Sequence, residues 1–148
     1  MEIRLEMRIA VLIGSPNKDG SSNLLAESFV GGAKEVGHSV QIIDAAHVNI
    51  HPCTGCIHCG YEGPCVQRDD IESVKSAILE ADMLVFVAPL YYYGMSAQLK
   101  TLIDRCQRRF KIVIKRRRNF VVFRRGVGNK IKRFLAQKEC SRSVASGA

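Results

Sequence analysis

Four of the six cysteines in this sequence lie within thirteen residues, and their spacing is a strong chemical signal. They are Cys53, Cys56, Cys59 and Cys65. The N-terminal residues have no signal-peptide pattern, so we expect a cytoplasmic protein, in which disulfides are rare. Thiolates separated by two residues are typical ligands of an iron–sulfur cluster, and the pattern therefore predicts such a site.

Two other interpretations of these cysteines stay open. Zinc also binds four thiolates, or three thiolates with an imidazole such as that of His58, although zinc sites more often pair two separated C-x-x-C hooks. Alternatively, the loop carries reduced cysteines and no metal. We assign no role to His47 or His51, and we interpret Cys106 and Cys140 as isolated thiols.

A second signal is the loop that follows the apolar run Arg8–Ile13. It reads Ser15-Pro-Asn-Lys-Asp-Gly-Ser-Ser22 and leads into a helical pattern. Backbone N–H groups, hydroxyls and a helix N-terminus together suit a phosphate. The loop has neither a Walker pattern nor G-x-G-x-x-G. On its own, it is explained slightly better as an ordinary βα turn with a serine cap.

A third signal is the loop Pro89–Ser96, which follows another apolar run. It contains three consecutive tyrosines and Gly94. One tyrosine at the end of a strand is usually packing, but three beside a glycine suggest a platform for a flat heterocycle. The two loops together favour a flat, phosphorylated ligand.

The remaining pattern predicts the elements that position these loops. In order, we expect a strand at Arg8–Ile13, a helix from Ser22 to a cap at Gly37, a strand at Ser39–Asp44, a helix opened by a capping box of Asp69 and Glu72, a strand at Met83–Ala88 and a helix capped by Ser96. The expected inward faces are Leu25, Phe29 and Ala33, then Ile71, Val74, Ile78 and Ala81, then Leu99, Leu102, Ile103 and Cys106.

Alternating strands and helices predict an α/β fold with a doubly wound parallel sheet between two helix layers. The strands are short and almost continuously apolar, as expected when both faces are covered. In such sheets, ligands bind beyond the carboxyl ends of the strands where the strand order reverses. The first and third strands end in the two loops described above.

Three segments resemble the NAD(P)H-dependent FMN reductase-like branch of flavodoxin-fold proteins. They are GSPNKDGSSNLLAESFVGGAKE, PCTGCIHC and APLYYYGMSAQLKTLIDR, in the family's order. The resemblance covers about residues 7–105 and implies a flavodoxin-like fold. The cysteine spacing is similar to the compact motif of iron–sulfur flavoproteins in the same group.

The resemblance also implies site residues. The FMN phosphate would be held by Ser15, Asn17, Ser21, Ser22 and Asn23. The isoalloxazine would face Pro89, Leu90, Tyr91, Tyr92, Gly94 and Met95. Relatives often carry Arg at the position of Asn17, so this chain lacks one charge partner for the phosphate. A [4Fe–4S] cluster would be bound by the four clustered cysteines.

The net charge changes sign near Cys106: residues 1–105 carry −5 and residues 106–148 carry +13. We consider three explanations: a tail that binds nucleic acid or acidic membranes, a divergent end completed by a partner subunit, and a shifted reading frame. We favour the last, with a sheet incomplete at its C-terminal end. Lys111–Lys115 or Asn119–Phe123 could form a fourth strand, and Lys130–Glu139 a basic helix. Residues 1–6 would be a spurious extension.

The sequence as a whole predicts an FMN-dependent oxidoreductase that passes electrons from NAD(P)H or another donor to a small-molecule or protein acceptor. The flavin supplies the redox chemistry, so we assign no catalytic side chain. Relatives often form homo-oligomers. The alternatives are a non-catalytic electron carrier, a truncated inactive protein, or binding of nucleic acid by the tail; no membrane partner is expected.

Overall fold

Four parallel strands form one sheet in the computed structural model, which describes residues 6–60, 63–106 and 118–124. The strands are β1 (Arg8–Ile13), β2 (Ser39–Asp44), β3 (Met83–Pro89) and β4 (Arg118–Arg124). Their order is β2-β1-β3-β4, which is the flavodoxin-like order over these strands. The expected fold class is therefore confirmed.

The strands β1 and β3 form the buried centre of the sheet. In β1, Val11 and Leu12 have no exposed surface, and Leu84 and Val85 are equally buried in β3. Their neighbouring side chains point to opposite faces, so each strand contributes to two apolar cores. In contrast, β2 is an edge strand, and half of the surface of Ile42 is exposed.

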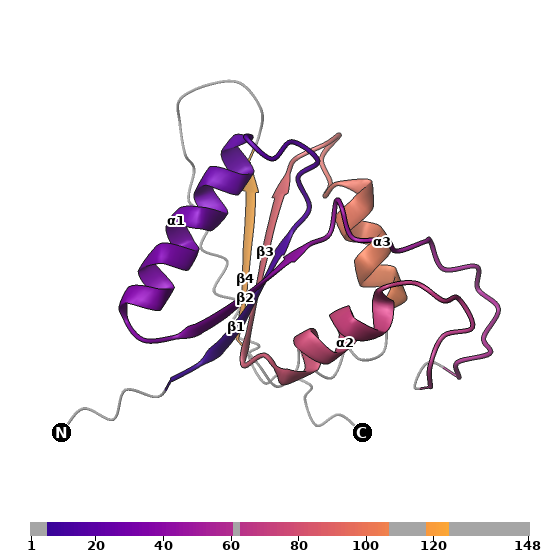
Figure 1. Ribbon diagram of the computed structural model, residues 1–148. Coiled ribbons are helices and arrows are strands. Elements are labelled where there is room, and N and C mark those ends of the chain that lie inside the picture. Colours follow the sequence, from indigo (N-terminus) through magenta and orange to yellow (C-terminus); the bar gives the residue numbers. More distant parts are fainter. Residues whose placement is uncertain (1–5, 61–62, 107–117, 125–148) are drawn as a thin grey trace, which may run out of the picture.

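Helices cover both faces of the sheet, which gives the expected three layers (Figure 1). The helix α1 (Ser21–Glu35) packs on one face with Ile9, Val11 and Val87. The helices α2 (Ile71–Glu80) and α3 (Ala97–Arg105) pack on the other face. None of the helices in the described residues is long and apolar enough to span a bilayer.

The inward face of α1 differs from the expected one. Its buried residues are Ser22, Ala26, Val30 and Ala33, whereas Leu25 and Phe29 are only half-buried. Small side chains at the contact let the helix lie close to the sheet, and the larger ones cover its margin. The helix ends as predicted: Gly37 has a φ of 89°, and its N–H donates to Lys34 O.

The capping box predicted at the start of α2 is wrong. The N-cap is Asp70, and its side chain makes no capping hydrogen bond. Asp69 is engaged by Arg105 instead, and Glu72 accepts hydrogen bonds from Cys65 N and Lys75 Nζ. The predicted inward face is confirmed, because Ile71, Val74, Ile78 and Ala81 are all buried.

The start of α3 agrees with the sequence. The hydroxyl of Ser96 is fully buried and accepts the backbone N–H of Leu99 at 3.4 Å. Leu99, Leu102 and Cys106 are buried as predicted, and Ile103 packs against them at the margin. The helix is therefore fixed at its first turn by a cap and along one face by apolar packing.

A fourth strand is confirmed at the Asn119–Phe123 alternative, because β4 pairs with β3 in parallel. The other alternative, Lys111–Lys115, and the predicted helix Lys130–Glu139 lie outside the described residues.

Candidate functional site

The loops after β1 and β3 meet at one edge of the sheet. In the parallel register Ile13 lies opposite Val87, and the N–H of Gly14 donates to Val87 O at 2.8 Å. From β1 the chain goes to β2 on one side, and it later returns to β3 on the other side. The strand order therefore reverses between β1 and β3, where a doubly wound sheet forms its ligand crevice.

The loop after β1 is held in shape by its own polar groups. The Asn17 side-chain oxygen accepts the backbone N–H of Asp19 at 3.1 Å, and Asn17 O accepts that of Gly20 at 3.1 Å. The buried hydroxyl of Ser15 also donates to Asn17 O. These bonds form a compact turn that leads directly into α1.

The N-terminus of α1 is open to a ligand. Its N-cap is Gly20, and no side chain caps it. Ser21 and Ser22 follow at the first two helical positions, where backbone N–H groups lack partners within a helix. The amide of Asn23 donates to Lys18 O at 3.0 Å, but its buried Oδ1 has no partner among the described residues. A buried acceptor of this kind is costly unless a ligand donates to it.

Gly14 joins this loop to the first turn of α3. A Cβ at this position would lie 2.7 Å from Leu99 Cβ and 2.7 Å from Ser96 Oγ. Real Cβ atoms do not approach other atoms this closely, so only glycine lets the backbone after β1 pass α3 here.

The loop after β3 is a tight turn that presents tyrosine rings. The backbones of Tyr91 and Gly94 exchange two hydrogen bonds of 2.9 Å, and Tyr92 and Tyr93 between them have φ values of 41° and 65°. Two successive positive φ values are typical of a type I′ turn. Tyr92 is 98% exposed, and its ring meets that of Tyr93 edge to face at 5.9 Å.

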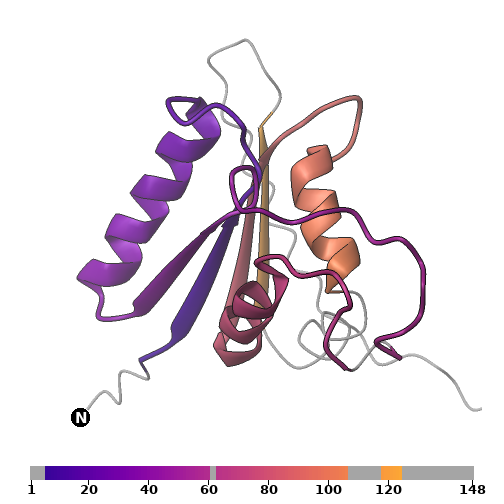
Figure 2. The same ribbon diagram turned by 45° about the vertical axis from the view of Figure 1, so that its right-hand side comes forward.

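The cysteine loop, defined here as residues 53–65, lies on the side of the sheet that carries α2 and α3 (Figure 2). Its described residues form neither helix nor strand. Cys53 and Cys56 are exposed, and Cys59 and Cys65 are half-buried. All four cysteines are among the residues that line one cavity of about 140 Å³.

Backbone N–H groups point at two of the sulfurs. The sulfur of Cys53 accepts the N–H of Gly55 at 3.5 Å. The pKa of Cys56 is lowered, first by the backbone N–H of His58 and then by hydrogen bonds from the His58 and Thr54 side chains. The backbone allows this because Gly55 and Ile57 have φ values of 69° and 60°. A positive φ at a β-branched residue is strained, and such strain is concentrated at functional sites.

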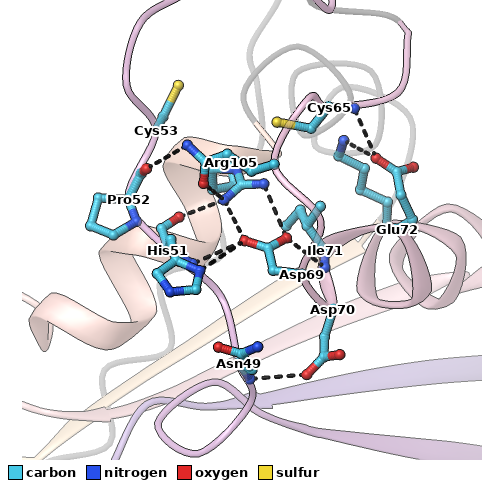
Figure 3. A network of polar contacts seen from close by, with 12 residues as sticks. Asn49, His51, Pro52, Cys53, Cys65, Asp69, Asp70, Ile71, Glu72 and Arg105 are labelled. Atoms are coloured by element: carbon cyan, nitrogen blue, oxygen red, sulfur yellow. Dashed lines mark hydrogen bonds and ion pairs between the residues drawn. The ribbon is translucent and has the colours of Figure 1, made fainter.

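A buried ion pair anchors the cysteine loop (Figure 3). Arg105 Nη1 lies 2.7 Å from Asp69 Oδ2, and Nη2 lies 3.1 Å from Oδ1. The two side chains are 2% and 0% exposed. Arg105 Nη1 also donates to His51 O at 2.6 Å and to Gln67 Oε1 at 2.8 Å. One guanidinium therefore holds the residues on both sides of the loop.

The ion pair shifts the pKa of each partner. Burial alone raises the pKa of Asp69, but hydrogen bonds from Arg105 and from the N–H groups of His51 and Ile71 outweigh it and lower the net value. Burial likewise lowers the pKa of Arg105, but Asp69 and then Cys65 raise it above its ordinary value. Both groups are therefore charged near neutral pH.

A family comparison identifies the chain. The family model described as NADPH-dependent FMN reductase matches residues 7–128, which takes the match past Cys106 and through β4. The chain belongs to this family. The family expected from the sequence is thus confirmed.

Several curated relatives of this FMN reductase family member are iron–sulfur flavoproteins. One from Archaeoglobus fulgidus is 34% identical over 99 residues, which are 67% of this chain and 45% of that protein. One from Methanocaldococcus jannaschii is 35% identical over 99 residues, covering 67% of this chain and 51% of that protein. The chain thus spans about half the length of these relatives.

Solved structures share the fold of this family member. An azoreductase of Bacillus anthracis has a TM-score of 0.65 at 19% identity, over 81% of this chain and 69% of that chain. An NAD(P)H:quinone oxidoreductase of Methanothermobacter marburgensis has a TM-score of 0.60 at 24% identity, over 69% of this chain and 53% of that chain. At these identities the likeness shows the flavodoxin-like architecture alone.

The phosphate-side residues implied by the family resemblance lie on one loop and helix start, but they offer different groups. Ser15 and Ser22 are buried, Ser21 and Asn23 are half-buried, and Asn17 is exposed. Because Ser22 belongs to the inward stripe of α1, its backbone N–H is better placed for a phosphate than its hydroxyl. The Oδ1 of Asn17 is already used within the loop.

The ring-side residues implied by the family resemblance lie at the end of β3 and in the turn that follows it. Pro89, Leu90, Gly94 and Met95 are half-buried, and Tyr91 and Tyr92 are exposed. Met95 packs against the core beneath the turn. The base of the turn is thus fixed while its aromatic rings stay accessible.

The four cysteines share a cavity but do not form a preassembled metal site in the described part of the chain. Cys106, which the sequence suggests is an isolated thiol, is a buried free cysteine, and it is among the residues that line the same cavity. Cys140 lies outside the described residues.

Sequence reasoning missed the residues that hold this loop. Asp69 is assigned to a helix cap, and Arg105 is noted only as the end of a family segment. The sequence shows only an acidic residue before one predicted helix and a basic residue at the end of another. This combination is too common to identify an ion pair.

Proposed function

We propose that this chain binds FMN across the loops after β1 and β3 and acts as an NAD(P)H-dependent oxidoreductase. When bound, FMN would supply hydride and electron transfer between NAD(P)H and a small-molecule or protein acceptor. The side chains of this chain bind and orient the flavin, and none of them is required as an acid or base.

The open N-terminus of α1 is the observation that carries this proposal. A helix N-terminus without a side-chain cap presents N–H groups and a positive partial charge to an anion. The unpartnered Oδ1 of Asn23 beside it suits a hydroxyl donor such as the ribityl chain of the flavin. Both features fit a phosphorylated sugar alcohol better than they fit an ordinary turn.

The turn Tyr91–Gly94 would support the ring system. Its two cross-turn hydrogen bonds fix the backbone, and Tyr92 and Tyr93 present aromatic surface beside the switch point. A flat heterocycle can stack on such rings with little loss of side-chain freedom. The phosphate and the ring would thus be held by two loops that the sheet register brings together.

We further propose that Cys53, Cys56, Cys59 and Cys65 bind a [4Fe–4S] cluster. N–H groups that donate to Cys53 and Cys56 would stabilise thiolate ligands, as around iron–sulfur clusters. The names of the curated relatives support the same choice. Cluster binding requires the cysteine loop to close, since the sulfurs are not assembled without it.

The purified chain, loaded with FMN under anaerobic conditions, tests the oxidoreductase proposal. NADPH or NADH is expected to bleach the flavin absorbance, and a quinone or azo dye is expected to restore it. Bound flavin that neither nucleotide reduces would leave a carrier role and contradict the proposed activity.

Reconstitution with ferrous iron and sulfide tests the cluster. We expect about four iron and four sulfide per chain, with broad charge-transfer absorbance. A Cys56→Ser variant should lose most of this absorbance while keeping FMN binding. Stable uptake of zinc, with no iron–sulfur absorbance, would contradict the proposed cluster.

A further inference from the structure

The two flanks of the cysteine loop meet at one nitrogen atom. Arg105 Nη1 donates to His51 O, two residues before Cys53, and to Gln67 Oε1, two residues after Cys65. Gln67 Nε2 in turn donates to Pro52 O at 3.2 Å. Arg105 and Gln67 therefore close the loop at its base.

We propose that Arg105 is the positioning residue of the four-cysteine metal site: its buried guanidinium holds both flanks of the loop and so sets the separation of Cys53 and Cys65. This inference rests on the metal-binding part of the proposed function. It concerns a residue that is not itself a ligand.

The placement of Arg105 supports a role toward the cavity as well as toward the core. Arg105 lines the cavity together with Cys53 and Cys65. Figure 3 shows its guanidinium between the segments that carry these two cysteines. Asp69 holds the guanidinium bidentately, which fixes its plane and leaves Nη1 directed at the loop flanks. Glu72 adds a second anchor by accepting the N–H of Cys65 at 3.3 Å.

Holding the flanks lowers the cost of assembling four ligands. A free loop loses conformational entropy when its ends are brought together, and a loop closed in advance has already lost it. Residues that orient metal ligands without touching the metal typically change metal affinity by a factor of about 10–100. The middle of the loop, with Cys56 and Cys59, would then fold around the metal from two fixed ends.

Lysine should not replace this arginine. The hydrogen bonds to Asp69, His51 and Gln67 use two nitrogens of a planar fork, whereas an ammonium is a single point charge. Arg105→Lys therefore keeps the charge near Asp69 but loses the simultaneous hold on both flanks. Gln67→Met is a milder variant, because it leaves the buried ion pair intact and removes the link to Pro52 O.

Cobalt(II) titration of the reduced full-length chain measures the effect directly, since thiolate-to-cobalt charge-transfer bands report thiolate ligation. We expect Arg105→Lys and Gln67→Met to weaken cobalt(II) binding about 10–100-fold. The matched control is Arg68→Met, because Arg68 is exposed and lies between Gln67 and Asp69. Its cobalt(II) affinity should equal that of the unchanged chain. FMN affinity, measured in parallel, shows that each variant is folded.

The outcomes separate this inference from the proposed function. If the unchanged chain binds cobalt(II) through thiolates and both variants bind it as tightly, the inference about Arg105 is wrong and the metal site stands. If the unchanged chain shows no thiolate bands and takes up no cluster, the metal site and the inference both fail. If Arg105→Lys also loses FMN binding, the result for Gln67→Met decides. An unchanged cobalt(II) affinity of Gln67→Met then overturns the inference.

Discussion

The two regions of this molecule that we propose as ligand sites are built in different ways. The loops after β1 and β3 are set by the parallel register of the sheet, which places Ile13 opposite Val87. The cysteine loop has no strand or helix among its described residues and depends on one buried ion pair, Arg105–Asp69. The first region is supported by many backbone hydrogen bonds, and the second by a few side chains from distant parts of the chain.

This difference predicts which substitutions should affect ligand affinity and which should affect folding. The sheet distributes its support over the whole core, so replacing a single side chain in the loops after β1 and β3 should change ligand affinity more than folding. A loop held by one desolvated ion pair concentrates its support, so removing either partner leaves an uncompensated buried charge. The following predictions test that contrast.

The largest effect is expected for Arg105→Ala. Both side chains of the ion pair are almost fully buried, so the variant should lose about 3–5 kcal/mol in the free energy of unfolding. Urea unfolding followed by circular dichroism measures this. Lys100→Ala is the control, because its ion pair with Asp104 is exposed and should contribute about 0.3–0.5 kcal/mol. Equal losses of unfolding free energy in the two variants would mean that the buried ion pair contributes no more to stability than the exposed one.

Gly14→Ala should cost about 1–3 kcal/mol, because the added Cβ would overlap Leu99 and Ser96. It should also weaken FMN binding by shifting the loop after β1. Gly31→Ala is a matched control: nothing lies within 4 Å of a Cβ there, and alanine in this helix should add about 0.5–1 kcal/mol. Thermal unfolding and FMN titration of both variants check the prediction. A harmless Gly14→Ala would show that the loop can move away from α3.

Acid should weaken the protein partly through Asp69. The folded-state pKa of this carboxyl is lowered, so its contribution to stability is present above about pH 4, the ordinary value for Asp, and is lost as the pH falls through the lower folded value. The urea midpoint of the unchanged chain should therefore lie above that of Asp69→Asn at pH 5, and the difference between the two should shrink as the pH is lowered below about 4. Parallel pH dependences would mean that Asp69 is not the responsible group.

The smallest effect on folding is expected for Tyr92→Ala. Tyr92 is almost fully exposed, so stability should change by less than about 0.5 kcal/mol. FMN affinity should fall by a factor of about 2–10, which corresponds to one aromatic contact. Tyr92→Phe keeps the ring and should bind FMN like the unchanged chain. Quenching of FMN fluorescence measures the FMN affinity of all three proteins. An unchanged FMN affinity of Tyr92→Ala would mean that the isoalloxazine does not contact Tyr92.

The sequence predicts the strands and helices around the loops after β1 and β3 better than it predicts the contacts that hold the cysteine loop, and the reason is physical. The continuous apolar run Met83–Ala88 and the cap at Ser96 are local sequence patterns. The strand and the helix start that they predict form through local hydrogen bonds and packing. The partnership of Asp69 with Arg105 spans 36 residues and is decided by packing between α3 and the segment just before α2. A local capping pattern at Asp69 and Glu72 was therefore overridden by a tertiary ion pair.

The basic C-terminal segment shows the same limit. The sequence offers two apolar stretches for the fourth strand, and no local pattern selects between them. The choice is made by the pairing of β4 with β3. The shifted reading frame proposed for residues 106–148 and the extension proposed for residues 1–6 stay predictions. Translating the other two frames of the coding DNA tests the first: a further β-α-β pattern in one of them supports it, and its absence in both contradicts it.

The affinity of the folded chain for FMN compared with riboflavin tests the central claim most directly, because the two flavins differ only in the phosphate. If the N-terminus of α1 and the loop before it bind that phosphate, FMN should bind tighter by a factor of about ten or more, as hydrogen bonds to a charged group imply. Equal affinity for both flavins, or no binding of FMN by folded protein, would contradict the account.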